Sequence, residues 1–120
     1  MPVRSLNSSV FRWPNRASVE RAAREWAAIA VELHPGLRRL GYFGSYARGN
    51  WGVGSDLDLV AVVEQSGEPF ERRSLGWDLS QLPVPAEILV YTMDEWENLA
   101  SSEARFSRML REQTVWLFER

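Results

Sequence analysis

The sequence predicts an α+β fold, an α/β sandwich in which helices pack against one small mixed β-sheet. Two observations lead to this prediction. Some segments carry apolar residues at helical spacing, and short runs rich in valine, leucine and isoleucine lie between them. A chain of 120 residues builds one hydrophobic core, so we expect a single domain over residues 1–120 with one site.

The first half of the chain predicts a helix followed by two strands. The helix starts at Ser18, carries apolar residues every three or four positions, and ends at the His-Pro-Gly sequence at 34–36. The segment LRRLGYFG at 37–44 predicts a short strand, and a glycine-rich stretch follows it directly. Residues 57–63, LDLVAVV, are almost continuously apolar beyond Asp58, which predicts a strand covered on both faces.

The middle of the chain predicts a helix and then another strand. Pro69 suits the first position of a helix that runs to about Leu79, although the apolar periodicity there is blurred. Pro83 and Pro85 precede a second β-rich run, AEILVYT at 86–92, which predicts a further strand.

The C-terminal part predicts two helices and a last strand. Thr92, with Glu95 three residues later, forms a capping-box pattern that marks the start of a helix. A second short helix follows Ser101-Ser102, with Phe106, Met109 and Leu110 on its apolar side. The tail TVWLFER at 114–120 is then an edge strand or an extended arm.

Composition excludes several kinds of site and compartment. The chain has no cysteine, which excludes disulfides and thiolate metal sites, and its net charge of −2 gives no overall attraction to nucleic acid. The longest apolar run is too short to cross a bilayer, and the N-terminal segment MPVRSLNSSVFRWP lacks the apolar stretch of a secretory signal. We therefore expect a cytoplasmic protein with no membrane partner.

Aromatic residues are numerous: six tryptophans, five phenylalanines and three tyrosines. Such an excess can mark a surface that binds a partner protein. The simpler interpretation, which we favour, is that most of these rings belong to the core.

Two aspartates stand one residue apart at the start of the predicted strand at 57–63. The two-residue period of a strand sends Asp56 and Asp58 to the same face, about 6.6 Å apart along it, where their like charges repel. A Mg²⁺ ion relieves such repulsion because it prefers carboxylate oxygens together with substrate phosphates. Glu87 stands at the head of the next β-rich run, and three acids can hold two metal ions for phosphoryl transfer.

The glycine-rich stretch supplies groups that can hold phosphate. Gly44 and Ser45 lie where a strand ends and a helix can begin, so backbone N–H groups and the Ser45 hydroxyl can face a polyphosphate. Arg48, about one turn later, can add a charged contact. Trp51, inside the same stretch, either stacks on a nucleobase or covers the loop.

Together these residues carry a resemblance. Gly44-Ser45, ten further residues, and then Asp56-Leu57-Asp58, all within GSYARGNWGVGSDLDLVAVV, resemble the signature of the minimal nucleotidyltransferases of the DNA polymerase beta superfamily. The resemblance implies a nucleotidyltransferase fold, with residues 1–16 as an N-terminal arm and a catalytic core over about 17–118.

The resemblance also implies a reaction and a set of site residues. The protein would transfer a nucleoside monophosphate, AMP, from ATP or another nucleoside triphosphate to a hydroxyl. The acids Asp56, Asp58 and Glu87 would be catalytic and would bind two Mg²⁺ ions. The nucleotide would be bound by Gly44, Ser45, Arg48 and Ser55.

The third acid departs from the family pattern. This acid is most often aspartate, and the extra methylene of Glu87 changes its reach, so activity can be weak. Asp94 is the alternative, but it falls in the first turn of a predicted helix, where a carboxylate already has a structural role.

For the biological role, the resemblance leaves three hypotheses. The first is an antitoxin that binds a helical HEPN-type toxin partner and adds AMP to it. The second is a small-molecule transferase like the aminoglycoside nucleotidyltransferases, with a homodimer completing the pocket. The third is a silent protein that only binds its partner.

The remaining polar residues have plain interpretations. His34 ends the first predicted helix, where a cation would suit the helix dipole, and we expect it to be structural or solvated. The arginine pairs either form a basic rim for substrate or, as we favour, a solvated face. These pairs are Arg38 with Arg39 and Arg72 with Arg73.

Overall fold

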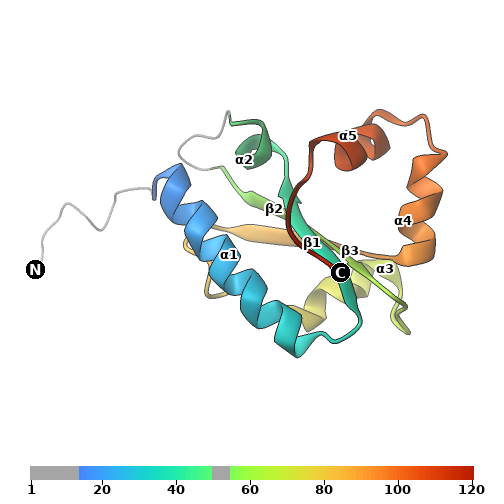
Figure 1. Cartoon of the computed structure of the whole chain (residues 1–120), viewed down its shortest axis with the longest axis horizontal. Helices are drawn as coiled ribbons and strands as arrows, with labels where there is room; N and C mark the ends of the chain where they lie inside the picture. Colours follow the sequence, from blue (N-terminus) through green and yellow to red (C-terminus); the bar gives the residue numbers. More distant parts are fainter. Residues whose placement is uncertain (1–13, 50–54) are drawn as a thin grey trace, which may run out of the picture.

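The computed structural model describes residues 14–49 and 55–120. Within these residues, four strands form one mixed sheet, and helices cover both of its faces (Figure 1). The elements are α1 (Arg16–Leu33), β1 (Leu37–Phe43), α2 (Ser45–Arg48), β2 (Leu57–Val63), α3 (Phe70–Arg73), β3 (Ala86–Thr92), α4 (Met93–Ala100), α5 (Arg105–Gln113) and β4 (Val115–Glu119). The predicted α+β class is confirmed.

The sheet has the strand order β3-β2-β1-β4. Strand β1 runs antiparallel to both β2 and β4, whereas β2 and β3 are parallel. The end of β1 therefore lies beside the beginnings of β2 and β3. This shared end of the sheet is where the residues of interest gather.

Helix α1 begins slightly earlier than the apolar pattern suggests. Asn15, rather than Ser18, is the N-cap: its Oδ1 accepts a hydrogen bond from the Ser18 backbone N–H at 2.8 Å. The helix ends at His34, whose N–H donates to the Ala30 carbonyl, as expected from the Pro-Gly that follows. No helix in the described part of the chain has the length and apolar character needed to cross a membrane.

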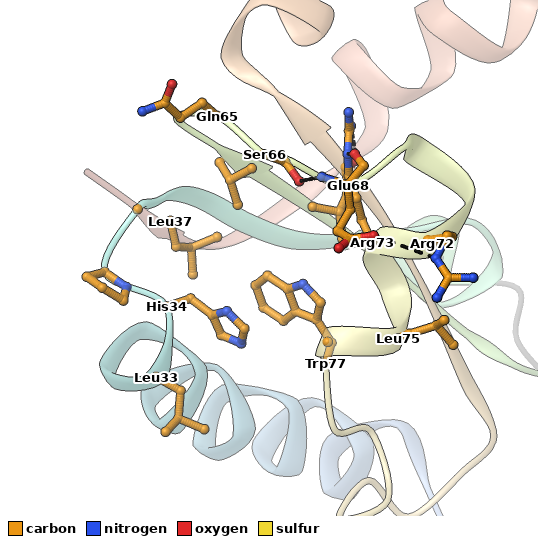
Figure 2. Close-up of a pocket in the computed structure, with 15 residues that line it drawn as sticks. Leu33, His34, Leu37, Gln65, Ser66, Glu68, Arg72, Arg73, Leu75 and Trp77 are labelled. Atoms are coloured by element: carbon orange, nitrogen blue, oxygen red, sulfur yellow. Dashed lines mark hydrogen bonds and ion pairs between the residues drawn. The ribbon is translucent and has the colours of Figure 1, made fainter.

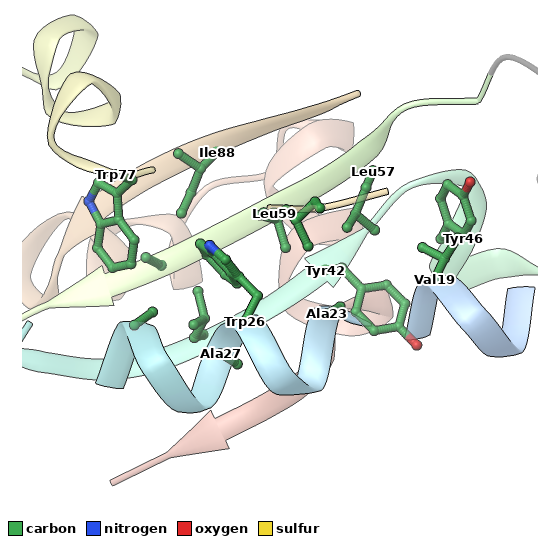
Figure 3. Packing of buried hydrophobic residues seen from close by; sticks show 14 of the residues in the cluster. Val19, Ala23, Trp26, Ala27, Tyr42, Tyr46, Leu57, Leu59, Trp77 and Ile88 are labelled. Atoms are coloured by element: carbon green, nitrogen blue, oxygen red, sulfur yellow. The ribbon is translucent and has the colours of Figure 1, made fainter. Parts of the chain in front are cut away.

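Each face of the sheet has its own cluster of buried side chains. On one face α1 packs against the sheet, with Ala23 and Trp26 pointing toward Leu59 (Figure 3). On the other face, Trp96 of α4 and Leu110 of α5 cover β1 and β2 in a cluster that also contains Phe43, Val60 and Val62. Strand β2 is thus buried on both sides, as predicted.

The aromatic residues mostly belong to these two clusters. Trp26, Trp77 and Trp96 are all less than a tenth exposed, and Tyr42 and Tyr46 are 2% exposed. The core interpretation is confirmed for these rings. Trp51 lies outside the described residues.

The predicted helix from Pro69 to about Leu79 is wrong in its length. Helix α3 ends at Arg73, and a single 3-10 turn at Ser74–Gly76 leads into Trp77, which is extended at φ −118° and ψ 125°. The apolar residues here do not share one helical face, so a longer helix would not bury them together. The extended backbone instead lets Trp77 reach the core, where it is 9% exposed.

The four arginines that we considered as a rim are each paired with a carboxylate. Arg38 contacts Glu64 at 3.3 Å, and Arg39 contacts Glu119 at 3.6 Å. Arg72 pairs with Glu68 and Arg73 with Glu95 in the same way. These guanidinium groups are neutralised by carboxylates within the chain. The pairing supports the interpretation of a solvated face for Arg38, Arg39 and Arg72, but not for Arg73.

Arg73 forms a clamp between α3, β3 and α4. Its Nη1 and Nη2 donate to the two carboxylate oxygens of Glu95 at 2.6 and 3.1 Å, and Nη1 also donates to the Val90 carbonyl at 3.0 Å. Glu95 also accepts from the Thr92 N–H, which completes the predicted capping box. The guanidinium beside Glu95 lowers the pKa of that carboxyl, with a smaller contribution from the Thr92 backbone.

We expect Glu95→Gln to destabilise the protein by about 1 kcal/mol at neutral pH, because it removes the charge opposite Arg73 and keeps an oxygen for the cap. Since the folded pKa of Glu95 is lowered, its stabilising contribution is present at neutral pH and is lost as the pH falls through that pKa. The difference between variant and wild type in urea unfolding should therefore shrink as the pH falls below the ordinary pKa of a glutamate and vanish below the lowered pKa of folded Glu95.

The matched control for this clamp is Glu64→Gln, which breaks the exposed pair with Arg38. Exposed ion pairs contribute little, so its unfolding free energy should change by less than about 0.5 kcal/mol. An effect of Glu95→Gln no larger than that of the control would contradict a stabilising clamp.

Candidate active site

The strand register brings two of the predicted acids side by side. Asp58 is the Cα partner of Glu87 across the parallel β2–β3 pair and of Phe43 across the antiparallel β1–β2 pair. Directly opposed residues project to the same face of a sheet. Phe43 belongs to the buried cluster under α4 and α5, so Asp58 and Glu87 lie at the sheet end on that face.

Electrostatics links Asp56 and Arg48 to the same place. Burial raises the pKa of Asp58, and the negative charges of Glu87 and Asp56 raise it further, in that order. The Arg48 guanidinium opposes these effects only in part. The charges of three carboxylates and one guanidinium thus influence one another, and the negative charge of the acids exceeds the positive charge of Arg48.

Gly44 holds the turn directly against Asp58. Its backbone has φ 77° and ψ −148°, a combination that L side chains rarely adopt. A Cβ at this position would collide with the Asp58 carboxylate oxygen and would lie 3.3 Å from its Cγ. The chain therefore needs glycine here so that the turn after β1 can touch the carboxylate of β2.

Helix α2 is the single helical turn that the glycine-rich stretch was expected to begin. Ser45 is its first residue, and the Arg48 N–H donates to the Gly44 carbonyl at 3.0 Å. Gly49, in the left-handed region at φ 81°, ends it by donating to the Ser45 carbonyl. The first N–H groups of a helix have no intrahelical acceptor, so this turn presents donors beside Asp58.

The other predicted site residues lie at the same end of the sheet, with one exception. Ser55 is half-buried just before β2, and Arg48 is exposed at the end of α2. Asp94, the alternative third acid, lies in the first turn of α4, which begins at the far end of β3 from Glu87. The structure therefore brings Glu87, and not Asp94, to Asp58.

The donor set at this end fits a hard cation. Carboxylate oxygens are the ligands that Mg²⁺ takes in proteins, usually one or two together with phosphate oxygens. Within residues 14–49 and 55–120, no three Asp, Glu or His side chains are already arranged around one point that an ion could occupy. Asp56 and Glu87 are exposed, so their side chains have room to turn toward Asp58.

A groove of about 370 Å³ reaches Glu87 from the β3 side. It runs along β3 beside α3, and Glu87 and Glu71 supply its carboxylates. Phe70 and Leu79 form apolar parts of its wall, and Ser74 also lines it. A molecule in this groove would meet Glu87 at the sheet edge.

A larger cavity of about 520 Å³ lies at the opposite end of the sheet, where β1 begins and β2 and β3 end. There the rings of His34 and Trp77 stack with centroids 3.7 Å apart and planes within 6° (Figure 2). Burial lowers the pKa of His34, so the ring is neutral at pH 7 and is not a helix-end cation. The expected structural role of His34 is confirmed, and this cavity is remote from the acids.

Comparisons with known proteins agree with the geometry. The family model described as "Nucleotidyltransferase domain" matches residues 24–116. No curated protein matches the chain.

Three solved structures are similar to the chain to different degrees. A Sulfolobus solfataricus protein assigned as a nucleotidyltransferase has 19% identity and a TM-score of 0.64, over 88% of this chain and 84% of its own. A toxin–antitoxin with AMP-PNP has 14% identity and a TM-score of 0.49, covering 81% and 73%. A mutant of the toxin–antitoxin MntA-HpeT has 15% identity and a TM-score of 0.47, covering 89% and 75%. At 19% identity, the likeness to the Sulfolobus solfataricus protein concerns the fold alone.

Proposed function

The chain belongs to the nucleotidyltransferase domain family, and from this membership we propose that it transfers AMP from ATP to a hydroxyl in the presence of Mg²⁺. The observation that carries the proposal is the contact between the Gly44 turn and Asp58, with Glu87 as the neighbour of Asp58 on β3. The N–H groups that would bind phosphate and the acids that would bind metal therefore lie at one end of the sheet.

Each residue of the site has a role in this proposal. Asp56 and Asp58 would hold Mg²⁺, with Glu87 as the third carboxylate, and the metal would neutralise charge on the triphosphate. The Gly44-Ser45 turn and Arg48 would hold the phosphates, and Ser55 lies close enough along the chain to contribute. A preformed site favours this reaction, because positioning of the reactants and stabilisation of charge supply most of the catalysis of phosphoryl transfer.

The acceptor hydroxyl would approach from the β3 side. Its oxygen forms a bond to the α-phosphorus, the bond from that phosphorus to the β-phosphate oxygen breaks, and pyrophosphate leaves. The hydroxyl proton passes to Glu87 or to water. Glu87 is suited to this role because it lies on the side of Asp58 away from the Gly44 turn and lines the groove along β3.

We propose that a HEPN-type toxin presents the hydroxyl and that the chain is its antitoxin. The described residues build one sheet with its covering helices and contain no second lobe that would grip an acceptor. A partner would then have to supply the other wall. A cationic small molecule with a hydroxyl is the second candidate, because the groove along β3 carries the carboxylates of both Glu71 and Glu87.

The proposal is tested with the purified chain, Mg²⁺ and ATP labelled at the α-phosphate. We expect label to appear on a co-expressed HEPN-type partner and pyrophosphate to be released, and EDTA to stop both. Transfer to an aminoglycoside instead would favour the small-molecule acceptor. No transfer from any of the common nucleoside triphosphates would contradict the enzymatic proposal and favour a protein that only binds.

A further inference from the structure

Phe106 exposes an aromatic ring on the side of the site opposite the β3 groove. It belongs to α5 and is 47% exposed. The other exposed large apolar residues of the described chain line cavities elsewhere: Leu33 and Leu75 at the far end of the sheet, Ile29 between α1 and Trp77, and Phe70 in the groove along β3. Phe106 is therefore the exposed large apolar side chain that needs an explanation near β1.

The position of Phe106 is set by Phe43. Their ring centroids are 6.0 Å apart with an interplanar angle of 85°, a favourable edge-to-face contact. Phe43 is itself 7% exposed, so its ring has little freedom to move. The edge-to-face contact fixes Phe106 and leaves much of its ring surface open to solvent.

Phe43 also connects Phe106 to the acids. It is the last residue of β1, it precedes Gly44, and it is the Cα partner of Asp58. Directly opposed side chains in an antiparallel pair have Cβ atoms about 5 Å apart on one face. Figure 1 shows α5 and α2 at the same edge of the molecule, next to the end of β1. Phe106 thus contacts the residue that pairs with Asp58 and precedes the Gly44 turn.

We propose that Phe106 is the platform on which the base of the bound nucleotide stacks. The inference rests on the proposed function, which puts the phosphates at the Gly44-Ser45 turn. The ribose separates the base from the phosphates, so the base needs a surface near the turn but not at it. Phe106, in contact with the residue that precedes Gly44, offers such a surface. Stacking on a single ring depends on the π-face that all bases share, so it gives affinity with little preference among bases.

The test compares the binding of ATP with Mg²⁺ to that of inorganic tripolyphosphate with Mg²⁺, which has no base. Phe106→Ala should weaken ATP binding about 5- to 100-fold and leave tripolyphosphate binding unchanged. Phe106→Trp should bind ATP at least as tightly as the wild type because its indole offers a larger face. The control is Leu75→Ala, which truncates the most exposed of these apolar residues at the far end of the sheet and should change neither.

Several outcomes would contradict the proposed stacking role of Phe106. Unchanged ATP binding by Phe106→Ala would contradict it. The same holds if this variant binds ATP normally and loses only its binding to a protein partner. Equal losses of ATP and tripolyphosphate would show collapse of the site rather than loss of stacking, and so would failure of Phe106→Trp to bind ATP. If the wild type binds tripolyphosphate but not ATP, the platform is wrong while the phosphate site stands. If it binds neither, the proposed function itself fails.

Discussion

Asp58→Asn is expected to abolish nucleotidyl transfer and to leave the melting temperature of the ligand-free protein equal or higher. The activity should fall by at least about 100-fold, the scale of losing one electrostatic stabiliser of a transition state. The stability should not fall, because asparagine keeps the shape of Asp58 and removes a negative charge that burial, Glu87 and Asp56 all disfavour.

The pH dependence of this effect has a definite sign. The folded pKa of Asp58 is raised above its ordinary value, so ionisation of Asp58 destabilises the fold once the pH rises through the folded pKa. The advantage of Asp58→Asn should therefore be largest at neutral pH and shrink toward acid pH, where wild-type Asp58 is protonated. Thermal unfolding of both proteins across this range measures it.

Asp94→Asn is the matched control, since it makes the same chemical change in the first turn of α4. It should preserve transfer and lower stability slightly, by about 0.3 to 1 kcal/mol, because a carboxylate there favours the helix dipole. A loss of more than about 2 kcal/mol in Asp58→Asn would instead assign that carboxylate a structural role.

The strands, and the position of the acids at one end of the sheet, could be predicted because their signals are local. Strand β2 is a continuous apolar run, and the start of α4 has a complete capping box. Asp58 and Glu87 are each the second residue of a parallel strand, so the topology alone makes them neighbours once β2 and β3 pair. The sequence showed these positions without showing the pairing.

Other features depend on packing between distant segments and had no local signal. The length of α3 was overestimated because burial of Trp77 against α1 favours an extended backbone over another helical turn. The contact of Phe106 with Phe43 depends on where α5 lies over β1, which no spacing within α5 specifies. The pairing of Arg73 with Glu95 likewise spans 22 residues.

Substitution of Gly44, the glycine of the turn after β1, has the second large expected effect. Gly44→Ala should destabilise the protein by about 2 kcal/mol or more and eliminate MgATP binding, because the backbone at φ 77° is strained for alanine and the new methyl meets the Asp58 carboxylate. Gly49→Ala is the matched control: its φ is 81°, but among residues 14–49 and 55–120 its Cβ would come near only Arg16 Nη1, at 3.9 Å. It should cost about 1 kcal/mol and retain binding. Urea unfolding and calorimetric titration with MgATP measure the two effects.

A double-mutant cycle separates strain from collision at Gly44. Asp58→Ala removes the carboxylate that the new methyl would meet, so Gly44→Ala should cost less in that background than in the wild type. The part of the cost that remains is the conformational strain of the positive φ, and it should resemble the cost of Gly49→Ala. If the two backgrounds give the same cost, the turn does not press on Asp58, and the close approach on which the phosphate site depends is absent.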